Sequence, residues 1–195
     1  MNEGGFPLLL KELSTTIEQF EAKDGTTVTF RPATIQDSKG IVNAVEEIVA
    51  EGTYLQKETV RSVEEERQFI NEMKSNENMY IVVDINGKVS GLARVLRGSL
   101  EMKKHTGLFR TWLSPDAQGK GIGKKLMSYT LHWCKLNKFH KLCLTVFASN
   151  HVAVELYKKV GFVIEGIQKE QVWLNGTFDD EVFMAYFFQS GGEEK

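Results

Sequence analysis

The sequence predicts a mixed α/β fold, with helices packed on a central sheet, in one main domain. Three observations predict this fold class. Strand-like apolar runs alternate along the chain with segments whose apolar residues recur at helical spacing. Two hairpin dipeptides, Asp24-Gly25 and Asn86-Gly87, mark antiparallel strand pairs. The 195 residues are enough for one well-packed core, and no repeat or linker divides them.

The first half of the chain is expected to begin with a strand pair, which Pro32 ends. Two helices should follow, because apolar residues such as Ile41, Val45 and Ile48 recur on one helical face. A second strand pair then surrounds the second hairpin dipeptide. These elements are expected over residues 16–32, 34–50, 58–74 and 79–96.

The second half is expected to continue as strand, helix, strand, short helix and two or three closing strands. The first four of these are expected over residues 106–113, 122–135, 141–147 and 151–160. Gly161 suits the C-terminal cap of the short helix. We therefore expect residues 1–25 to form an N-terminal extension with a hairpin strand, residues 26–188 the main domain and residues 189–195 a frayed tail.

Composition indicates a globular protein and argues against some partners. Apolar residues make up 42% of the chain and charged residues 26%, which is ordinary for a folded soluble protein. The net charge of −2 gives no sign of a nucleic-acid partner. The N-terminal apolar run is too short for a signal peptide, and no segment has the length of a membrane span. We therefore expect a cytoplasmic protein with no membrane partner.

The cysteines and histidines predict neither a disulfide nor a metal site. Cys134 and Cys143 lie in apolar stretches and form no CxxC pair, so we expect them to be buried and reduced. The four histidines show no spacing typical of metal ligands. No metal cofactor is expected.

A glycine- and lysine-rich loop, "SPDAQGKGIGKKLM" at residues 114–127, separates a predicted strand from a predicted helix. It does not match a P-loop, because Gln118 stands where the first glycine is needed and Lys125 where a serine or threonine is needed. It does not match a dinucleotide fingerprint either, because Lys124 replaces the third glycine and no acidic residue follows at the distance that binds a ribose. Neither of these nucleotide folds is predicted.

The charge around this loop nevertheless favours an anion. Residues 117–154 contain six lysines and no acidic residue, within a chain of negative net charge. Backbone N–H groups at a helix N-terminus and nearby lysines suit a polyanion, and glycine lets the backbone approach phosphate closely. The alternative is a mobile glycine turn with solvated lysines.

Two sequence blocks resemble the GNAT (GCN5-related N-acetyltransferase) superfamily. Residues 118–123, Gln-Gly-Lys-Gly-Ile-Gly, fit the family's pyrophosphate-loop pattern Q/R-x-x-G-x-G/A. Residues 150–162, "NHVAVELYKKVGF", resemble the family's N-x-x-A-x-x-L-Y-x-x-x-G-F block. The blocks are separated by a helix and a strand, as in that fold. The resemblance implies a GNAT fold with a mixed central sheet, splayed fourth and fifth strands and helices on both faces.

The resemblance also implies acetyl-CoA as the co-substrate and a set of residues that bind it. Main-chain groups of the strand before the loop would pair with the pantetheine arm, and the loop amides would bind the pyrophosphate. Asn150 would either contact the arm, cap the next helix, or do both. The cofactor-binding residues so implied are Trp112, Leu113, Gln118, Gly119, Lys120, Gly121, Ile122, Gly123, Lys124, Asn150 and Tyr157.

The family's reaction implies an acid and a base. Tyr157 matches the tyrosine that the family places beside the thioester sulfur, although it also belongs to an apolar helical stripe. A protonated amine must lose a proton before it attacks. Some family members use a glutamate on the splayed strand, but Gly107 occupies that position here. His105 and Glu51 are candidate substitutes, and a water relay is a third route.

The acceptor is expected to be an amine, either a small molecule or a peptide. Residues 43–77 contain nine glutamates against four lysines and arginines. This excess would favour a cationic acceptor such as a polyamine, an aminoglycoside-like amine or a basic peptide, unless the glutamates are only solvated helix faces. An amino acid or a peptide N-terminus is also consistent with the family. The alternative function is a CoA-binding regulatory domain without turnover. Because strand-rich ends in this family often build dimers, a homodimer is one expected assembly.

Overall fold

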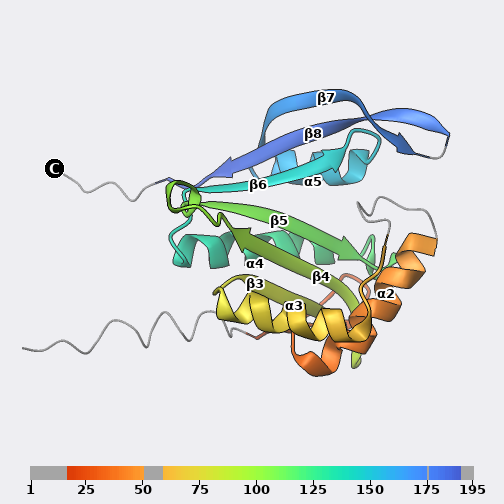
Figure 1. Ribbon diagram of the computed structural model, residues 1–195. Coiled ribbons are helices and arrows are strands. Elements are labelled where there is room, and N and C mark those ends of the chain that lie inside the picture. The colour runs from red at the N-terminus through yellow and green to blue at the C-terminus, as the bar shows by residue number, and fades with distance from the viewer. Residues whose placement is uncertain (1–16, 51–58, 175, 190–195) are drawn as a thin grey trace, which may run out of the picture. The chain divides into compact units, whose positions relative to one another are not determined.

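Residues 17–50, 59–174 and 176–189 are described by the computed structural model, in which the chain forms two units (Figure 1). The first unit contains Met1–Leu96 and Arg110–Asn137, and the second contains Arg97–Phe109 and Lys138–Lys195. The chain passes between the units within strand β5 (Thr106–Leu113), so each unit includes part of that strand.

The first unit is built on the strands β1 (Glu18–Glu21), β2 (Thr27–Pro32), β3 (Met79–Ile85) and β4 (Lys88–Arg97), followed by the second half of β5. They neighbour one another in that order, and β1 to β4 pair antiparallel. Both predicted hairpins are present: β1 joins β2 around Gly25, and β3 joins β4 around Gly87, each glycine with a positive φ.

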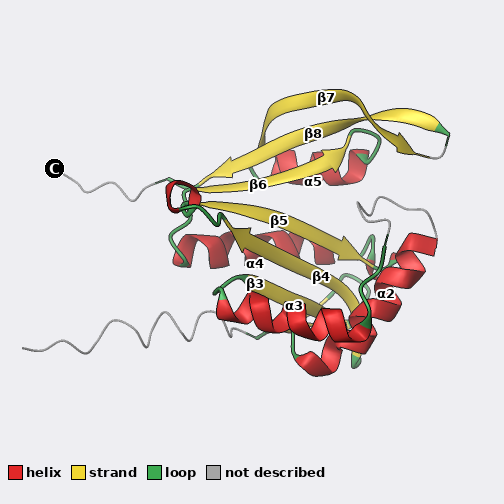
Figure 2. Cartoon of the chain, in the orientation of Figure 1, coloured by secondary structure: helices red, strands yellow, loops and turns green. Residues whose placement is uncertain are grey.

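Helices cover both faces of this sheet (Figure 2). One face packs against α2 (Ser38–Ala50) and α3 (Val63–Ser75). The core on this face consists of Ile41, Val45, Ile70, Met73, Tyr80, Val82, Val89 and Leu92. The other face packs against α4 (Ile122–Leu136), where the Tyr129 ring lies 5.8 Å from that of Phe30 on β2. Because both faces are covered, the first five residues of β3 are all buried.

Capping side chains decide where the first two helices begin. The predicted helix over residues 34–50 opens as a short 3-10 turn, Ile35–Asp37, before α2. The second helix begins at Val63, five residues later than predicted, because Ser62 and Glu65 form a capping box there. Residues 51–58 lie outside the described part of the chain.

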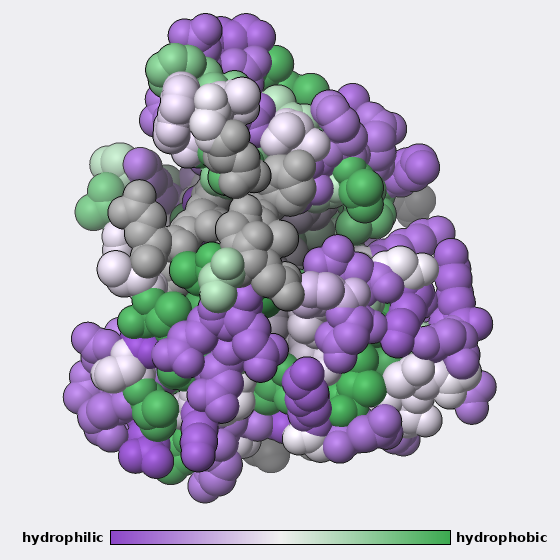
Figure 3. All heavy atoms as spheres, turned by 90° about the vertical axis from the view of Figure 1, so that its right-hand side faces the viewer, coloured by the Kyte–Doolittle hydropathy of each residue, from purple (hydrophilic) through white to green (hydrophobic). Residues whose placement is uncertain are grey.

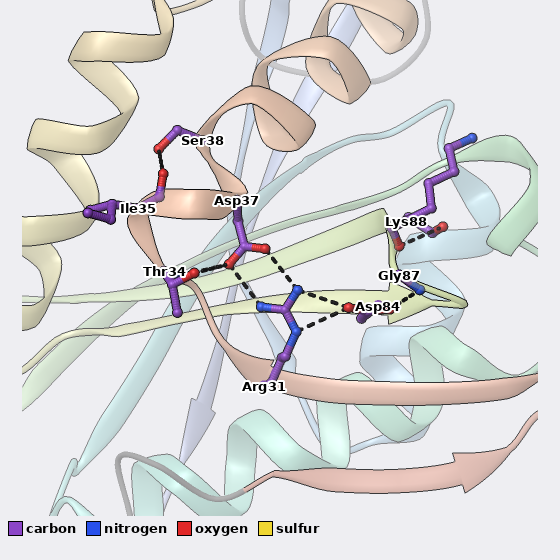
Figure 4. Close-up of polar contacts among 9 residues, drawn as sticks. Arg31, Thr34, Ile35, Asp37, Ser38, Asp84, Gly87 and Lys88 are labelled. Atoms are coloured by element: carbon purple, nitrogen blue, oxygen red, sulfur yellow. Dashed lines mark hydrogen bonds and ion pairs between the residues drawn. The ribbon is translucent and has the colours of Figure 1, made fainter.

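An arginine joins three segments of the first unit (Figure 4). Both terminal nitrogens of Arg31, on β2, donate to the carboxylate of Asp37 over 2.8 Å. The same guanidinium donates to Asp84 Oδ2 on β3 over 2.9 and 3.1 Å. Asp37 also accepts hydrogen bonds from the main-chain N–H and hydroxyl of Thr34. This network fixes the turn that leads into α2.

The second unit contains a short 3-10 turn (Glu101–Lys103), the first half of β5 and four further elements. These are β6 (Lys141–Phe147), α5 (His151–Lys159), β7 (Val163–Leu174) and β8 (Thr177–Phe187). The strands neighbour one another in the order β5-β6-β8-β7. The pair β5–β6 is parallel, and β8 pairs antiparallel with both β6 and β7. Gly161 follows α5 with φ +102° and its N–H donates to the Lys158 carbonyl, as a helix C-terminus requires.

The predicted splay lies between β5 and β6, the fourth and fifth strands when β2 is counted first. Their parallel pairing covers three residue pairs and ends at Leu108↔Cys143. Beyond it, the main chain of β5 continues from Phe109 to Leu113.

The sequence predicts that both cysteines are buried and reduced. In the structure Cys134 is buried, Cys143 on β6 is only partly buried, and both are free thiols. Among the described helices, none is long and apolar enough to cross a bilayer.

Candidate functional site

Two glycines shape the loop between β5 and α4. Gly119 has φ +73° and Gly121 has φ +83°, the left-handed region that glycine adopts without strain. Gly121 is the residue immediately before α4, so the loop leads directly into the helix N-terminus. The first N–H groups of a helix have no partner within it and attract anions. A Cβ at Gly119 would have no heavy atom within 4 Å, so its backbone is open to approach.

Hydrogen bonds hold the loop against the end of β5. Gln118 Nε2 donates to the carbonyl of Leu113 over 3.0 Å. The N–H and hydroxyl of Ser114 both donate to the Ser90 carbonyl on β4 over 2.9 Å. The side chain of Gln118 therefore connects the loop to the end of β5.

The main-chain groups at the end of β5 alternate between its two edges. The Ser114 N–H faces β4, and the Trp112 carbonyl lies 3.0 Å from the place that a Cβ on Gly91 of β4 would occupy. Because alternate residues of an antiparallel strand bond to opposite sides, the main chain of Leu113 faces away from β4. The Trp112 side chain packs against the core cluster under α2 and α3.

The lysines of the loop differ in their partners. Lys120 forms an ion pair of 3.0 Å with Asp24, and Lys125 lies 4.0 Å from Glu18. The hydrogen bond from Lys120 lowers the pKa of Asp24 to about 2, so this carboxylate is ionised at any ordinary pH. Lys124 is exposed and has no ion-pair partner among the described residues.

The β1–β2 hairpin reaches the loop, which the sequence did not predict. The main-chain N–H of Lys23 donates to the Lys120 carbonyl over 3.2 Å. The Lys23 side chain passes Gly121, with Cε 3.3 Å from where a Cβ on that glycine would be. Lys23 therefore adds a fourth lysine to the surroundings of the loop. Because Lys23 lies far from the loop along the sequence, no local sequence pattern indicates this contact.

Asn150 and Tyr157 belong to the second unit. Asn150 precedes α5, and its Oδ1 accepts a hydrogen bond from the Ala153 N–H over 3.2 Å, so it caps the helix. Tyr157 on α5 is 8% exposed, and its ring lies 5.7 Å from that of Phe162. The apolar packing expected for Tyr157 is present.

Of the two candidate bases, His105 lies within the described residues and Glu51 does not. His105 is exposed and lies one residue before β5. Its carbonyl accepts from the N–H groups of His140 and Lys141, and its ring lies 5.9 Å from that of His140. Glu51 lies outside the described residues. Within those residues, no group of three or more His, Cys, Asp and Glu is placed to hold a metal ion.

The glutamates of α2 and α3 are mostly on solvated faces. Glu46, Glu47, Glu64, Glu65 and Glu72 are exposed. Figure 3 shows one face of the chain, over which hydrophilic side chains are spread widely. This favours the alternative that the acidic stretch is a solvated helix surface over the one that it selects a cationic acceptor.

A model described as the Acetyltransferase (GNAT) family matches residues 43–162, which include both sequence blocks and all of the loop. The chain belongs to the GNAT family. Among curated relatives, it is 30% identical over 115 residues to spermidine N(1)-acetyltransferase of Vibrio cholerae, covering 58% of this chain and 65% of the relative. It is 29% identical over 106 residues to the L-amino acid N-acetyltransferase AaaT of Escherichia coli, covering 54% of this chain and 65% of the relative. The matched region thus spans less than two thirds of these relatives.

Solved GNAT structures share the fold. A phosphinothricin acetyltransferase of Sinorhizobium meliloti, in complex with acetyl-CoA, superposes with a TM-score of 0.77 at 26% identity, covering 86% of this chain and 92% of that one. A GNAT acetyltransferase of Streptococcus pneumoniae gives a TM-score of 0.77 at 24% identity, covering 83% of this chain and 99% of that one. These GNAT structures confirm the predicted fold class.

Proposed function

We propose that this GNAT protein transfers the acetyl group of acetyl-CoA directly to a primary amine, on a small molecule or at a peptide N-terminus. The loop geometry carries the proposal. Two left-handed glycines open the backbone at the N-terminus of α4, and the loop carries three lysines. Relatives named as N-acetyltransferases and a similar structure holding acetyl-CoA support the same activity.

The loop suits the pyrophosphate of acetyl-CoA. The backbone from Gly119 to Lys124 would bind the phosphates, with Gln118 holding the loop to the end of β5. The Leu113 main chain, which faces away from β4, would pair with the pantetheine arm. Trp112 would support this edge through its packed side chain. Asn150, at the start of α5, would contact the arm while it caps the helix.

Two proton movements must accompany the transfer. The attacking amine has to be neutral, so a base takes its proton; His105, Glu51 or a water molecule would serve. When the bond between the carbonyl carbon and sulfur breaks, the sulfur leaves with the electron pair. The Tyr157 hydroxyl would donate a proton or a hydrogen bond to it. Acetyl-CoA supplies the activated acetyl group, and the chain supplies position and proton transfer.

The test is a CoA-release assay over polyamines, amino acids, aminoglycosides and peptides, with Tyr157→Phe as the variant. We expect the variant to lower kcat by about a hundredfold or more, since acid catalysis contributes about that much. The affinity for acetyl-CoA, measured by calorimetry, should change little. Tyr186→Phe is the matched control, because Tyr186 contacts the same Phe162 ring but has no proposed catalytic role.

Each other outcome points to a different error. Unchanged kcat in Tyr157→Phe would reject the acid role of this tyrosine. Tight acetyl-CoA binding with no acetylated product from any amine would instead favour a CoA-binding regulatory domain. The presence of Gly107, where some family members have a strand glutamate, supports that alternative.

A further inference from the structure

Arg94, on β4, is a cation that forms no ion pair or hydrogen bond with a carboxylate in the described part of the chain. Its side chain is partly buried, and its guanidinium carbon lies 5.2 Å from the centre of the Phe69 ring on α3. It forms no hydrogen bond or ion pair with the side chains of residues 17–50, 59–174 and 176–189. A partly buried arginine normally has an anionic or hydrogen-bonding partner.

The Glu66 carboxylate, which acts on this arginine electrostatically, is already engaged. Glu66, on α3, is 2% exposed and forms an ion pair of 3.1 Å with Arg61. It also accepts a hydrogen bond from the hydroxyl of Tyr80 on β3. Arg61 also stacks on the Phe69 ring that lies beside Arg94, with its guanidinium carbon 3.8 Å from the centre of that ring. Glu66 and Arg61 therefore balance each other and leave one positive charge in excess.

The charges around Arg94 are unfavourable for a second cation. Burial lowers the pKa of Arg94, and the positive charges of Arg61 and Arg110 lower it further, against the opposing effects of Tyr80 and of the Glu66 carboxylate. Arginine nevertheless stays charged in proteins. A cationic group brought to this place would meet repulsion, whereas an anion would relieve it.

Arg94 also lies on the strands that lead to the cofactor loop. Residues two apart on a strand share a face, so Arg94 shares that of Leu92, a member of the core cluster under α2 and α3. Trp112 of β5 packs against the same cluster, and Arg110, two residues earlier, faces the same way. From Arg110 to Leu113 the strand rises by only about 10 Å. An anion at Arg94 would thus lie on the face next to the edge that we assign to the pantetheine arm.

We propose that Arg94 binds the carboxylate of the acceptor, so that the amine to be acetylated is the amino group of a free α-amino acid. This inference rests on the proposed function and specifies its substrate class. The planar guanidinium matches a carboxylate with two parallel hydrogen bonds. A polyamine has no group for this site and would bring positive charge beside it.

The test compares acceptors that carry a carboxylate with acceptors that lack it. Each of the twenty L-amino acids is compared with its amide, with its decarboxylated amine where one exists, and with spermidine. For the amino acid that reacts best, we expect kcat/KM to exceed that of its amide by about thirtyfold or more. Arg94→Met should lower kcat/KM for the acid by a similar factor, mainly through KM, and leave the amide within about threefold.

Two further variants make the result specific. Arg94→Lys keeps the charge but not the paired hydrogen bonds, so it should recover only part of the activity on the amino acid. Arg67→Met is the control, because Arg67 is an exposed arginine of α3 whose partner is Glu64. Calorimetric titration of the same amino acids in the presence of CoA measures binding without turnover. Acetyl-CoA affinity and the thermal midpoint of each variant report folding.

The outcomes separate this inference from the proposed function. Equal kcat/KM for acid and amide, or spermidine as the best acceptor with no effect of Arg94→Met, would overturn the carboxylate site while the acetyltransferase activity stands. No acetylation of any acceptor would overturn the proposed function; the calorimetry then decides the site, because amino-acid binding lost in Arg94→Met supports it and absence of binding rejects it.

Discussion

At the scale of single residues, backbone conformation sets the geometry of the loop. Gly119 and Gly121 adopt positive φ values of +73° and +83°. Other residues of this chain also have positive φ, for example Asn86 at +54° in the β3–β4 turn, so the conformation alone is not diagnostic. What distinguishes Gly121 is its place immediately before α4, beside the Lys23 side chain.

Replacing Gly121 by valine should therefore weaken CoA binding strongly. The left-handed conformation costs a residue with a Cβ about 1–2 kcal/mol, and the valine methyls would meet the Lys23 chain. Calorimetry with CoA measures the loss. Gly87→Val is the control: it imposes a similar strain at φ +80°, in a turn where a Cβ meets nothing within 4 Å. If both variants bound CoA like the parent chain, the loop would not hold the phosphates.

At the scale of elements, side-chain networks fix how strands lead into helices. Arg31 connects β2, the turn before α2 and β3 through Asp37 and Asp84. Desolvation acts to raise the pKa of Asp37, but the hydrogen bonds from Arg31 and Thr34 outweigh it, so the pKa is lowered from 3.8. The same bonds to Asp37 raise the pKa of Arg31 despite its partial burial.

This network should make the first unit sensitive to acid. Because the folded pKa of Asp37 is depressed, its contribution to stability is present above about pH 3.8 and is lost as the pH falls through the lower folded value. Asp37→Asn should lower the free energy of unfolding at pH 7 by about 1–2 kcal/mol. Urea titrations at pH 7 and at pH 2.5 should show this difference shrinking in acid.

The control for this titration is Glu64→Gln, which breaks an exposed pair of 3.3 Å between Glu64 and Arg67. Exposed pairs contribute little, so this change should be small at both pH values. A constant gap between Asp37→Asn and the parent chain from pH 7 to 2.5 would show that the ionised form of Asp37 does not matter.

At the scale of the whole molecule, charge is distributed unevenly. The net charge is −2, yet residues 117–154 contain six lysines and no acid. The structure shows that the loop lysines are not equivalent, since Lys120 is paired with Asp24 while Lys124 has no ion-pair partner among the described residues. Lys23 and Asp24 bring charges of both signs to the loop from the first hairpin.

Binding of CoA should therefore depend on salt and on these charges. Lys124→Gln should weaken CoA binding by about two- to fivefold at low salt, and less at high salt, because exposed charges are screened. Asp24→Asn removes a negative charge and should strengthen it. Lys39→Gln, which removes an exposed lysine from α2, is the control for net charge. Equal effects of Lys124→Gln and Lys39→Gln would mean that Lys124 acts only through net charge.

The sequence by itself determined the order of the elements and the glycine loop, through short-range signals: hairpin dipeptides, apolar periodicity and glycines that permit left-handed turns. The family and the splayed pair were implied by the resemblance of two sequence blocks, residues 118–123 and 150–162, to the GNAT superfamily. Helix α3 begins five residues after its predicted start, because Ser62 and Glu65 form a capping box there, itself a local signal in the sequence. Most glutamates of α3 are exposed to solvent, so the acidic stretch does not by itself indicate the acceptor.

Only the tertiary structure decided which charges are already neutralised. It pairs Lys120 with Asp24, buries Glu66 against Arg61 and Tyr80, and leaves Arg94 without such a partner in the described residues. These partners come from different strands and helices, so their contacts depend on the order of strands in the sheet and on which face each helix covers. No local pattern of residues encodes that arrangement. The sequence thus identifies the loop that we propose to bind acetyl-CoA, whereas the packing of β3, β4 and α3 provides the inference about the acceptor.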